Sequence, residues 1–184
     1  MSPGKRMILP AQAGAECYIG GMSQITLKPI AYVRNEIRES KEDYWGDVPS
    51  VIEMDAEQFA PDALRGLDDF SHVEVLFHLS GVEDEFVVTG ARHPRGNPDW
   101  PLTGIFAQRG KARPNRIAAT ICRVIKVSKL EVVVANLDAL DGSPVLDIKP
   151  VLAEFLPDKR DVRQPSWSHE LMENYFLPNT EDGK

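Results

Sequence analysis

The segment from Ser71 to Leu79 constrains the fold more than any other part of the chain, because its side chains follow a period of two. One face would hold four apolar residues, Val73, Val75, Phe77 and Leu79. The other face would hold His72, Glu74, Leu76 and His78. This period is typical of a β-strand with one buried face. Such a strand is stable only within a sheet, so the chain needs further strands to pair with it.

Further strands are predicted on both sides of this segment. The candidates are 30–34, 105–108, 119–127 and 130–137, with a tight turn at Ser128-Lys129. Helical pattern is sparse: 61–66 could form one turn, and 168–176 forms a better helix with Ser168 as N-cap. Several strands at short spacing with few short helices predict a mainly β fold, either a small antiparallel barrel or a sandwich.

The chain length and the residue types at its ends limit the domain organisation. The 184 residues fit one domain with tails. We expect a disordered leader at 1–24, a single domain at 25–177 and a loose tail at 178–184. No apolar run approaches the roughly 18 residues of a membrane span, and no secretory signal is recognisable. Two cysteines without a CxxC pair suggest a reducing compartment, so we expect a cytoplasmic protein without membrane contact.

Charge is distributed unevenly along the chain. The net charge is −7, yet the segment 92–129 holds nine Lys or Arg and one acidic residue, Asp99. A local balance of +8 in an acidic protein is what a phosphate-binding face would show. From charge alone, a basic strip paired with acidic side chains elsewhere is the favoured interpretation.

The common catalytic motifs are missing from this sequence. It contains no GxGxxG, no GxxxxGK[ST] and no GxSxG. His72 and His78 would lie about 20 Å apart on one strand, too far to share a metal, so no metal site is predicted. Cys122 lies in an apolar strand, where a buried structural thiol is favoured over a nucleophile.

Acidic residues cluster in the segment LDALDGSPVLDIKP at 137–150. Asp141-Gly142-Ser143-Pro144 is a strong turn sequence. Asp147 and Lys149 would share a strand face and could pair, although a ligand role is also open. Asp141 and Asp147 are the candidates for a catalytic general base.

The segments GIFAQRGKARPN (104–115) and LDALDGSPVLDIKP (137–150) resemble the TsaA-like, or TrmO, family. LRGLDDFSHVEVLF (64–77) and PIAYVRNEI (29–37) resemble its earlier segments in the same order. The resemblance covers roughly Leu27 to Trp167. It implies a small antiparallel β-barrel that forms a homodimer. The implied activity is methyl transfer from S-adenosylmethionine to N6 of threonylcarbamoyladenosine beside the tRNA anticodon.

The resemblance also implies where the methyl donor and the RNA bind. The implied donor-binding residues are Arg109, Ala119, Leu140, Asp141, Gly142, Ser143, Pro144, His78, Leu79 and Ser80, with a looser match near 47–49. Arg92, Arg95, Arg113 and Arg116 could hold tRNA phosphates. The chain departs from the family pattern at Gln108, Gly110, Arg116, Ala118 and Val151, and Tyr44-Trp45-Gly46-Asp47 replaces a Pro-Arg-Gln loop.

Two other functions are consistent with the sequence. One is a regulatory module that binds S-adenosylmethionine without catalysis, which the altered motifs would permit. The other is a methyltransferase for a small molecule, which the net charge of −7 would permit. The basic segment favours tRNA over a small molecule.

Overall fold

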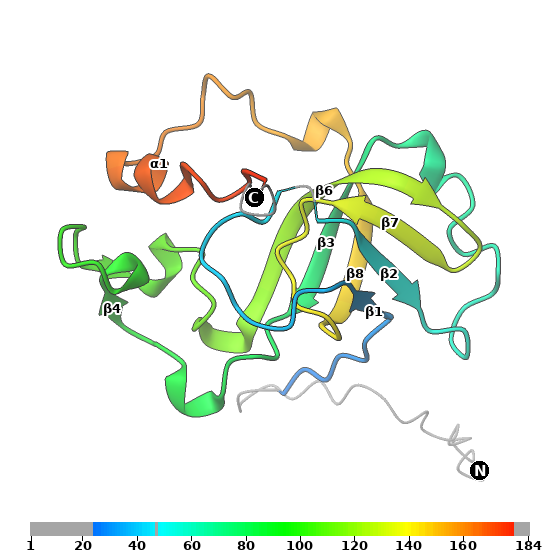
Figure 1. Ribbon diagram of the computed structural model, residues 1–184, viewed down its shortest axis with the longest axis horizontal. Coiled ribbons are helices and arrows are strands. Elements are labelled where there is room, and N and C mark those ends of the chain that lie inside the picture. The colour runs from blue at the N-terminus through cyan, green and yellow to red at the C-terminus, as the bar shows by residue number, and fades with distance from the viewer. Residues whose placement is uncertain (1–23, 47, 179–184) are drawn as a thin grey trace, which may run out of the picture.

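The computed structural model describes residues 24–46 and 48–178 (Figure 1). The expected leader and tail therefore fall almost entirely outside the described residues, and so does Asp47. Within these residues, no helix is both long enough and apolar enough to cross a membrane.

Six strands form a closed barrel in the order β1-β2-β7-β6-β3-β8. Their bounds are β1 Ala31–Arg34, β2 Ser50–Met54, β3 His72–His78, β6 Ile117–Val127, β7 Glu131–Ala135 and β8 Pro144–Pro150. Every pairing is antiparallel, and β1 closes the barrel by pairing with both β2 and β8. The prediction of a mainly β fold, and of a small antiparallel barrel, is confirmed.

The barrel interior explains the alternation in β3. Val73, Val75 and Phe77 are fully buried, while the residues between them are only partly covered. Valines and isoleucines from the other strands complete the core, and each contributes roughly 1.5–3 kcal/mol through burial of its apolar surface. Cys122 also points inward from β6 and is fully buried, as predicted.

Three features differ from the sequence-based expectation. The segment expected as a strand at 105–108 is a 3-10 turn, Ile105–Ala107, because Gln108 uses its side-chain amide to bind the carbonyls of Arg92 and Thr103. The turn expected at 61–66 is not an α-helical turn, and a 3-10 helix follows it at Leu67–Asp69. Strand β2 was not among the predicted elements.

A small lobe lies beside the barrel (Figure 1). It spans residues 90–113 and is built on β4 (Ala91–Arg92) and β5 (Thr103–Gly104), which form a separate two-stranded sheet. Short 3-10 turns lie within it and around it, at Asp84–Phe86, Pro94–Gly96 and Pro114–Arg116. We call residues 90–113 the β4–β5 lobe.

The C-terminal part of the chain leaves the barrel and returns to it. After β8 comes a 3-10 turn, Ala153–Phe155, and then the helix α1, Ser166–Met172. The helix begins two residues earlier than predicted, with Pro165 as N-cap, and the Ser168 hydroxyl donates to the Pro165 carbonyl. It ends at Met172, before the predicted residue 176, and beyond it the carbonyls of Asn174 and Tyr175 accept hydrogen bonds from Tyr44 and Trp45.

Candidate functional site

The donor-binding segments implied by the resemblance lie together at one end of the barrel. The end of β3 pairs with the start of β8, with Phe77 opposite Val145. A Cβ built on Gly81, just beyond β3, would lie 3.4 Å from Cδ1 of Leu140. His78–Ser80 and the turn at 140–144 are therefore neighbours, although more than fifty residues of sequence separate them.

The turn at Leu140–Pro144 is fixed by backbone hydrogen bonds to the start of the chain. Gly142 donates to the Val33 carbonyl at 2.8 Å, and Val33 donates back to Ser143 at 3.0 Å. Gly142 has φ +75°, a conformation that only glycine adopts at low cost. These bonds hold the turn rigidly against β1, so its remaining backbone groups keep a defined direction.

Arg109 and Ala119 are in direct contact. The guanidinium of Arg109 donates to the Ala119 carbonyl, although residue 109 belongs to the β4–β5 lobe and residue 119 to β6. Ala119 also pairs with Leu76 on β3. Arg109 and Ala119, ten residues apart in the sequence, are therefore in contact beside the end of β3.

His78 is the last residue of β3 and lies at the same end of the barrel. Burial lowers the pKa of His78, the positive charge of Arg116 lowers it further, and Asp84 opposes them. A neutral imidazole at this position can both donate and accept a hydrogen bond. Its neighbour Leu79 donates its backbone N–H to the Arg116 carbonyl at 2.8 Å, which ties the end of β3 to the start of β6.

The two candidate general bases are each paired with a cation. Asp141 forms an ion pair with Arg38 and accepts the backbone N–H of Asn35 at 3.1 Å. Asp147 forms an ion pair with Lys149, as the shared strand face predicted. Both carboxylates thus support the local structure of the turn and of β8.

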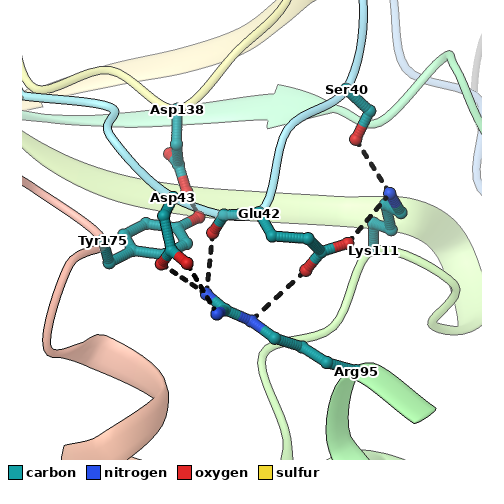
Figure 2. A network of polar contacts seen from close by, with 7 residues as sticks. All are labelled: Ser40, Glu42, Asp43, Arg95, Lys111, Asp138 and Tyr175. Carbon is teal, nitrogen blue, oxygen red and sulfur yellow. Dashed lines mark hydrogen bonds and ion pairs between the residues drawn. The ribbon is translucent and has the colours of Figure 1, made fainter. Parts of the chain in front are cut away.

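The four candidate phosphate-binding arginines differ in how strongly other side chains hold them. Arg95 contacts both carboxylate oxygens of Asp43 at 2.8 and 2.9 Å, and its Nε lies 3.3 Å from Glu42 (Figure 2). Arg116 contacts Asp84 at 2.7 Å, but that carboxylate is 91% exposed. Arg113 donates only to the Gln108 carbonyl, at 3.3 Å, and the Nε of Arg92 is buried without a partner among the described residues.

Part of the basic segment is therefore neutralised, as charge alone suggested. Glu42 and Asp43 together bind Arg95, and Glu42 also approaches Lys111 at 3.6 Å (Figure 2). Arg109 and Arg113 make no ion pair within 24–46 and 48–178. No carboxylate among the described residues therefore competes with an anionic ligand for these two arginines.

Asp138 belongs to the acidic cluster at 137–150, but neither it nor Tyr175 was among the predicted site residues. Asp138 accepts the hydroxyl of Thr120 at 2.5 Å and the hydroxyl of Tyr175 at 2.6 Å. Burial raises the pKa of Tyr175, the charge of Asp138 and their hydrogen bond raise it further, and the charges of Arg95 and Arg109 oppose them. The only sequence signal was the apolar setting of Asp138 between Leu137 and Ala139, both of which are buried.

Other surface features lie elsewhere. A shallow hollow lined by Pro61, Arg65, Val127, Lys129 and their neighbours lies at the β6–β7 turn and includes no candidate site residue. Among the described residues, no group of three or more His, Cys, Asp or Glu side chains is arranged to hold a metal ion.

Comparison with known proteins identifies the relatives of this chain. Residues 40–156 match the tRNA-methyltransferase O N-terminal domain, TrmO_N. The human "tRNA (adenine(37)-N6)-methyltransferase" is 35% identical over 118 residues, which are 64% of this chain and 26% of the relative. A "Probable S-adenosyl-L-methionine-binding protein" from Methanothermobacter thermautotrophicus is 31% identical over 69% of this chain and 90% of its own length.

The fold has solved counterparts as well. The crystal structure of TrmO from Pseudomonas aeruginosa superposes with a TM-score of 0.60 at 26% identity, covering 78% of this chain and 62% of that chain. The chain spans 26% of the human methyltransferase and 43% of the one from Escherichia coli. With the closed barrel and the match over most of its length, the chain belongs to the TrmO N-terminal domain family.

Proposed function

We propose that this chain binds S-adenosylmethionine and transfers its methyl group to tRNA, at N6 of threonylcarbamoyladenosine beside the anticodon. Curated relatives named as tRNA (adenine(37)-N6)-methyltransferases and as S-adenosyl-L-methionine-binding proteins support this activity. The threonylcarbamoyl substrate follows from the resemblance of the motifs. A cytoplasmic location would suit an enzyme that modifies tRNA.

One observation supports the proposal above all others. Donor positions from three separate motifs meet at one end of the barrel: His78–Ser80, Arg109 on Ala119, and the turn at 140–144. The turn also closes the barrel seam through its hydrogen bonds to Val33, so its rigidity is supplied by the fold itself. A rigid, polar edge made from three motifs is what a ligand with several polar groups needs.

The residues present suit the chemistry of the donor. The Arg109 guanidinium matches a carboxylate, and the backbone groups of the turn suit adenine or ribose. When bound, S-adenosylmethionine supplies an electrophilic methyl group on a sulfonium. The protein then has to align the two reactants and exclude water, which is a task for rigid segments such as the turn at Gly142. In this proposal Asp141 and Asp147 act by holding the turn and β8.

RNA binding is assigned to the arginines beside this edge. Arg113 and Arg116 are the best placed, since Arg113 makes no ion pair among the described residues and Arg116 pairs only with an exposed carboxylate. Arg92 and Arg95 would support them from the β4–β5 lobe. Replacing Arg113 and Arg116 by Gln should reduce the slope of log affinity against log salt by about 1.4, as expected for two contacts to single-stranded RNA. An unaltered slope would show that neither residue contacts phosphate.

We further propose that the chain forms a homodimer through the outer face of β6. Ile117, Ile121 and Ile125 point outward there and are 37, 43 and 47% exposed. These exposed isoleucines form an apolar surface that association would cover. Ile121→Glu should give a monomer in sedimentation equilibrium, while Ile25→Glu, an equally polar change on another exposed isoleucine, should not.

Nucleoside analysis tests the methyltransferase directly. The protein is incubated with tritiated S-adenosylmethionine and bulk tRNA, and the digested nucleosides are examined by mass spectrometry. A gain of one methyl group on threonylcarbamoyladenosine is expected, and Arg109→Ala should abolish it while Arg65→Ala, far from the site, should not. Methylation of another nucleoside would refute the substrate, and no methylation with retained donor binding would refute the enzyme.

A second function keeps the donor site but not the catalysis. The archaeal relative that the chain covers over 90% of its length is named only as a probable S-adenosyl-L-methionine-binding protein. The chain also has Gln108 and Gly110 where the family motif has other residues. Donor binding measured by calorimetry, combined with no transfer to tRNA or to small acceptors, would favour this regulatory alternative.

A further inference from the structure

The segment at 166–178 lies beyond the residues matched by the family, which end at 156, yet it packs against the candidate site. Trp100 donates its indole N–H to Glu170 at 2.9 Å, and its ring lies 6.4 Å from that of Trp167. In Figure 1, α1 lies beside the β4–β5 lobe, and the chain then returns toward the barrel. The segment therefore joins the lobe to the barrel.

The segment reaches the barrel at the loop that replaces the family's Pro-Arg-Gln sequence. Tyr44 donates to the Asn174 carbonyl at 3.1 Å, and Trp45 donates to the Tyr175 carbonyl at 2.8 Å. Gly46 lies so close that an added Cβ would overlap the Phe176 carbonyl, whose carbon would be 2.8 Å away. The absence of a side chain at Gly46 is thus required for this contact.

A chain of hydrogen bonds then links the segment to the donor edge. The Tyr175 hydroxyl donates to Asp138 at 2.6 Å (Figure 2). Asp138 also accepts the Thr120 hydroxyl at 2.5 Å. Thr120 directly follows Ala119, whose carbonyl receives Arg109. Every link between residue 175 and the Arg109 guanidinium is either a hydrogen bond or a peptide bond.

Trp45 adds a polar group that needs a partner. The residue is only 4% exposed, and its indole N–H has no hydrogen-bond acceptor among the described residues. The Nζ of Lys41 lies over the Trp45 ring, 4.9 Å from its centroid. A buried donor without an acceptor costs about 1–3 kcal/mol, so such groups are usually explained by a ligand or a bound water.

We propose that residues 174–177 complete the donor site of this chain, holding Trp45 so that its indole N–H binds the methyl donor, and fixing Asp138 so that Arg109 keeps its direction. The inference rests on the proposed function, since it takes S-adenosylmethionine as the ligand. The donor offers carboxylate, ribose and adenine acceptors, and each can accept from an indole N–H. Trp45 is then a binding residue, while Tyr175 and Asp138 are positioning residues.

Gly46→Ala is the sharpest perturbation, because the atoms that the new methyl group would overlap all belong to residues 176 and 177. It should displace the C-terminal segment and leave the barrel folded, as judged by far-ultraviolet circular dichroism. Donor affinity, measured by calorimetry with S-adenosylmethionine, should fall about tenfold, as for loss of a hydrogen bond to a charged group. Gly90→Ala is the matched control, since nothing lies within 4 Å of the position of its Cβ.

Two further variants separate binding from structure. Trp45→Phe keeps an aromatic side chain and removes the N–H, so it should weaken donor binding about fivefold. The smaller ring also lowers the melting temperature, so affinity is measured at a temperature where the variant is fully folded. A purely structural tryptophan would leave donor affinity unchanged. Tyr175→Phe should raise KM for the donor and leave kcat within twofold, because it shifts Arg109 and not the acceptor.

The outcomes distinguish this inference from the proposed function. If wild type and Gly90→Ala bind the donor equally while Gly46→Ala and Trp45→Phe bind it weakly, the inference is supported. Equal affinity for all four proteins would overturn the inference and leave the proposed function intact. Failure of the wild type to bind S-adenosylmethionine would overturn the proposed function, and the inference with it.

Discussion

Asp138→Ala should destabilise the protein by about 2–4 kcal/mol, because it leaves two hydroxyl groups without an acceptor. The Asp138 carboxylate accepts Thr120 at 2.5 Å and Tyr175 at 2.6 Å. Thr120 is buried and Tyr175 is half-buried, so neither hydroxyl is fully solvated once the carboxylate has gone. Each orphaned donor costs about 1–3 kcal/mol, and water entering the vacated space keeps the total near the lower end.

The magnitude can be measured by urea unfolding followed by tryptophan fluorescence. For a chain of this size, a loss of 2–4 kcal/mol corresponds to a fall of about 4–16 °C in the melting temperature. Asp138→Asn should cost less than half as much, since the amide keeps one acceptor and both hydroxyls can also accept. It serves as the shape-matched control.

A double-mutant cycle with Tyr175→Phe isolates one of the two bonds. The coupling energy between the two positions should be about 1–2 kcal/mol, in the range found for residues in direct contact. Strict additivity of Asp138→Ala and Tyr175→Phe would show that the bond contributes nothing. An Asp138→Ala variant within about 0.5 kcal/mol of wild type would refute the reasoning altogether.

Three further predictions concern single groups. Burial lowers the pKa of His78 in the folded protein, so as the pH falls the imidazole is protonated in the unfolded chain before it is protonated in the folded one. The contribution of His78 to stability should therefore be complete above about pH 6.5 and fall at lower pH. His78→Gln should flatten this pH dependence of the free energy of unfolding, measured by urea titration. Burial raises the pKa of the Cys122 thiol to about 12, so in a Cys17→Ser variant the thiol should not react with Ellman's reagent at pH 8 until urea is added; rapid reaction of the native protein would contradict its burial. Gly142→Ala should cost about 1–2 kcal/mol through its left-handed backbone alone, because nothing lies within 4 Å of the added Cβ, and an unchanged urea midpoint would argue against the φ of this turn.

The parts of the fold that could be predicted are those where one face of a strand is buried. β3 was evident because its inward residues must be apolar and its outward residues need not be. β2 was not evident because its inward residues include the polar Ser50 and its outward Val51 is apolar, so the sequence does not alternate. Residues 105–108 form a short apolar run that is compatible with either state, and here the Gln108 side chain decides in favour of a turn.

The candidate site was predictable only where a motif marks it. The turn at Gly142 could be recognised because Asp-Gly-Ser-Pro is a turn sequence in its own right. The contacts of Trp45 with Tyr175, and of Asp138 with Tyr175, join residues far apart in sequence. No local sequence pattern predicts such contacts, because they depend on the direction that the chain takes after α1.

The seam of the barrel has a consequence for synthesis of the protein. β1 pairs with β8, with Ala31 opposite Val145. β1 is synthesised long before β8, so this pairing cannot form until β8 has also left the ribosome. Until then β1 has only β2 as a possible neighbour, and closing so long a loop is slow. The turn at 140–144 lies at this seam, bonded through Gly142 to Val33. A nascent chain therefore forms the proposed donor edge in the same step that closes the barrel, so in this proposal incomplete chains do not bind the donor.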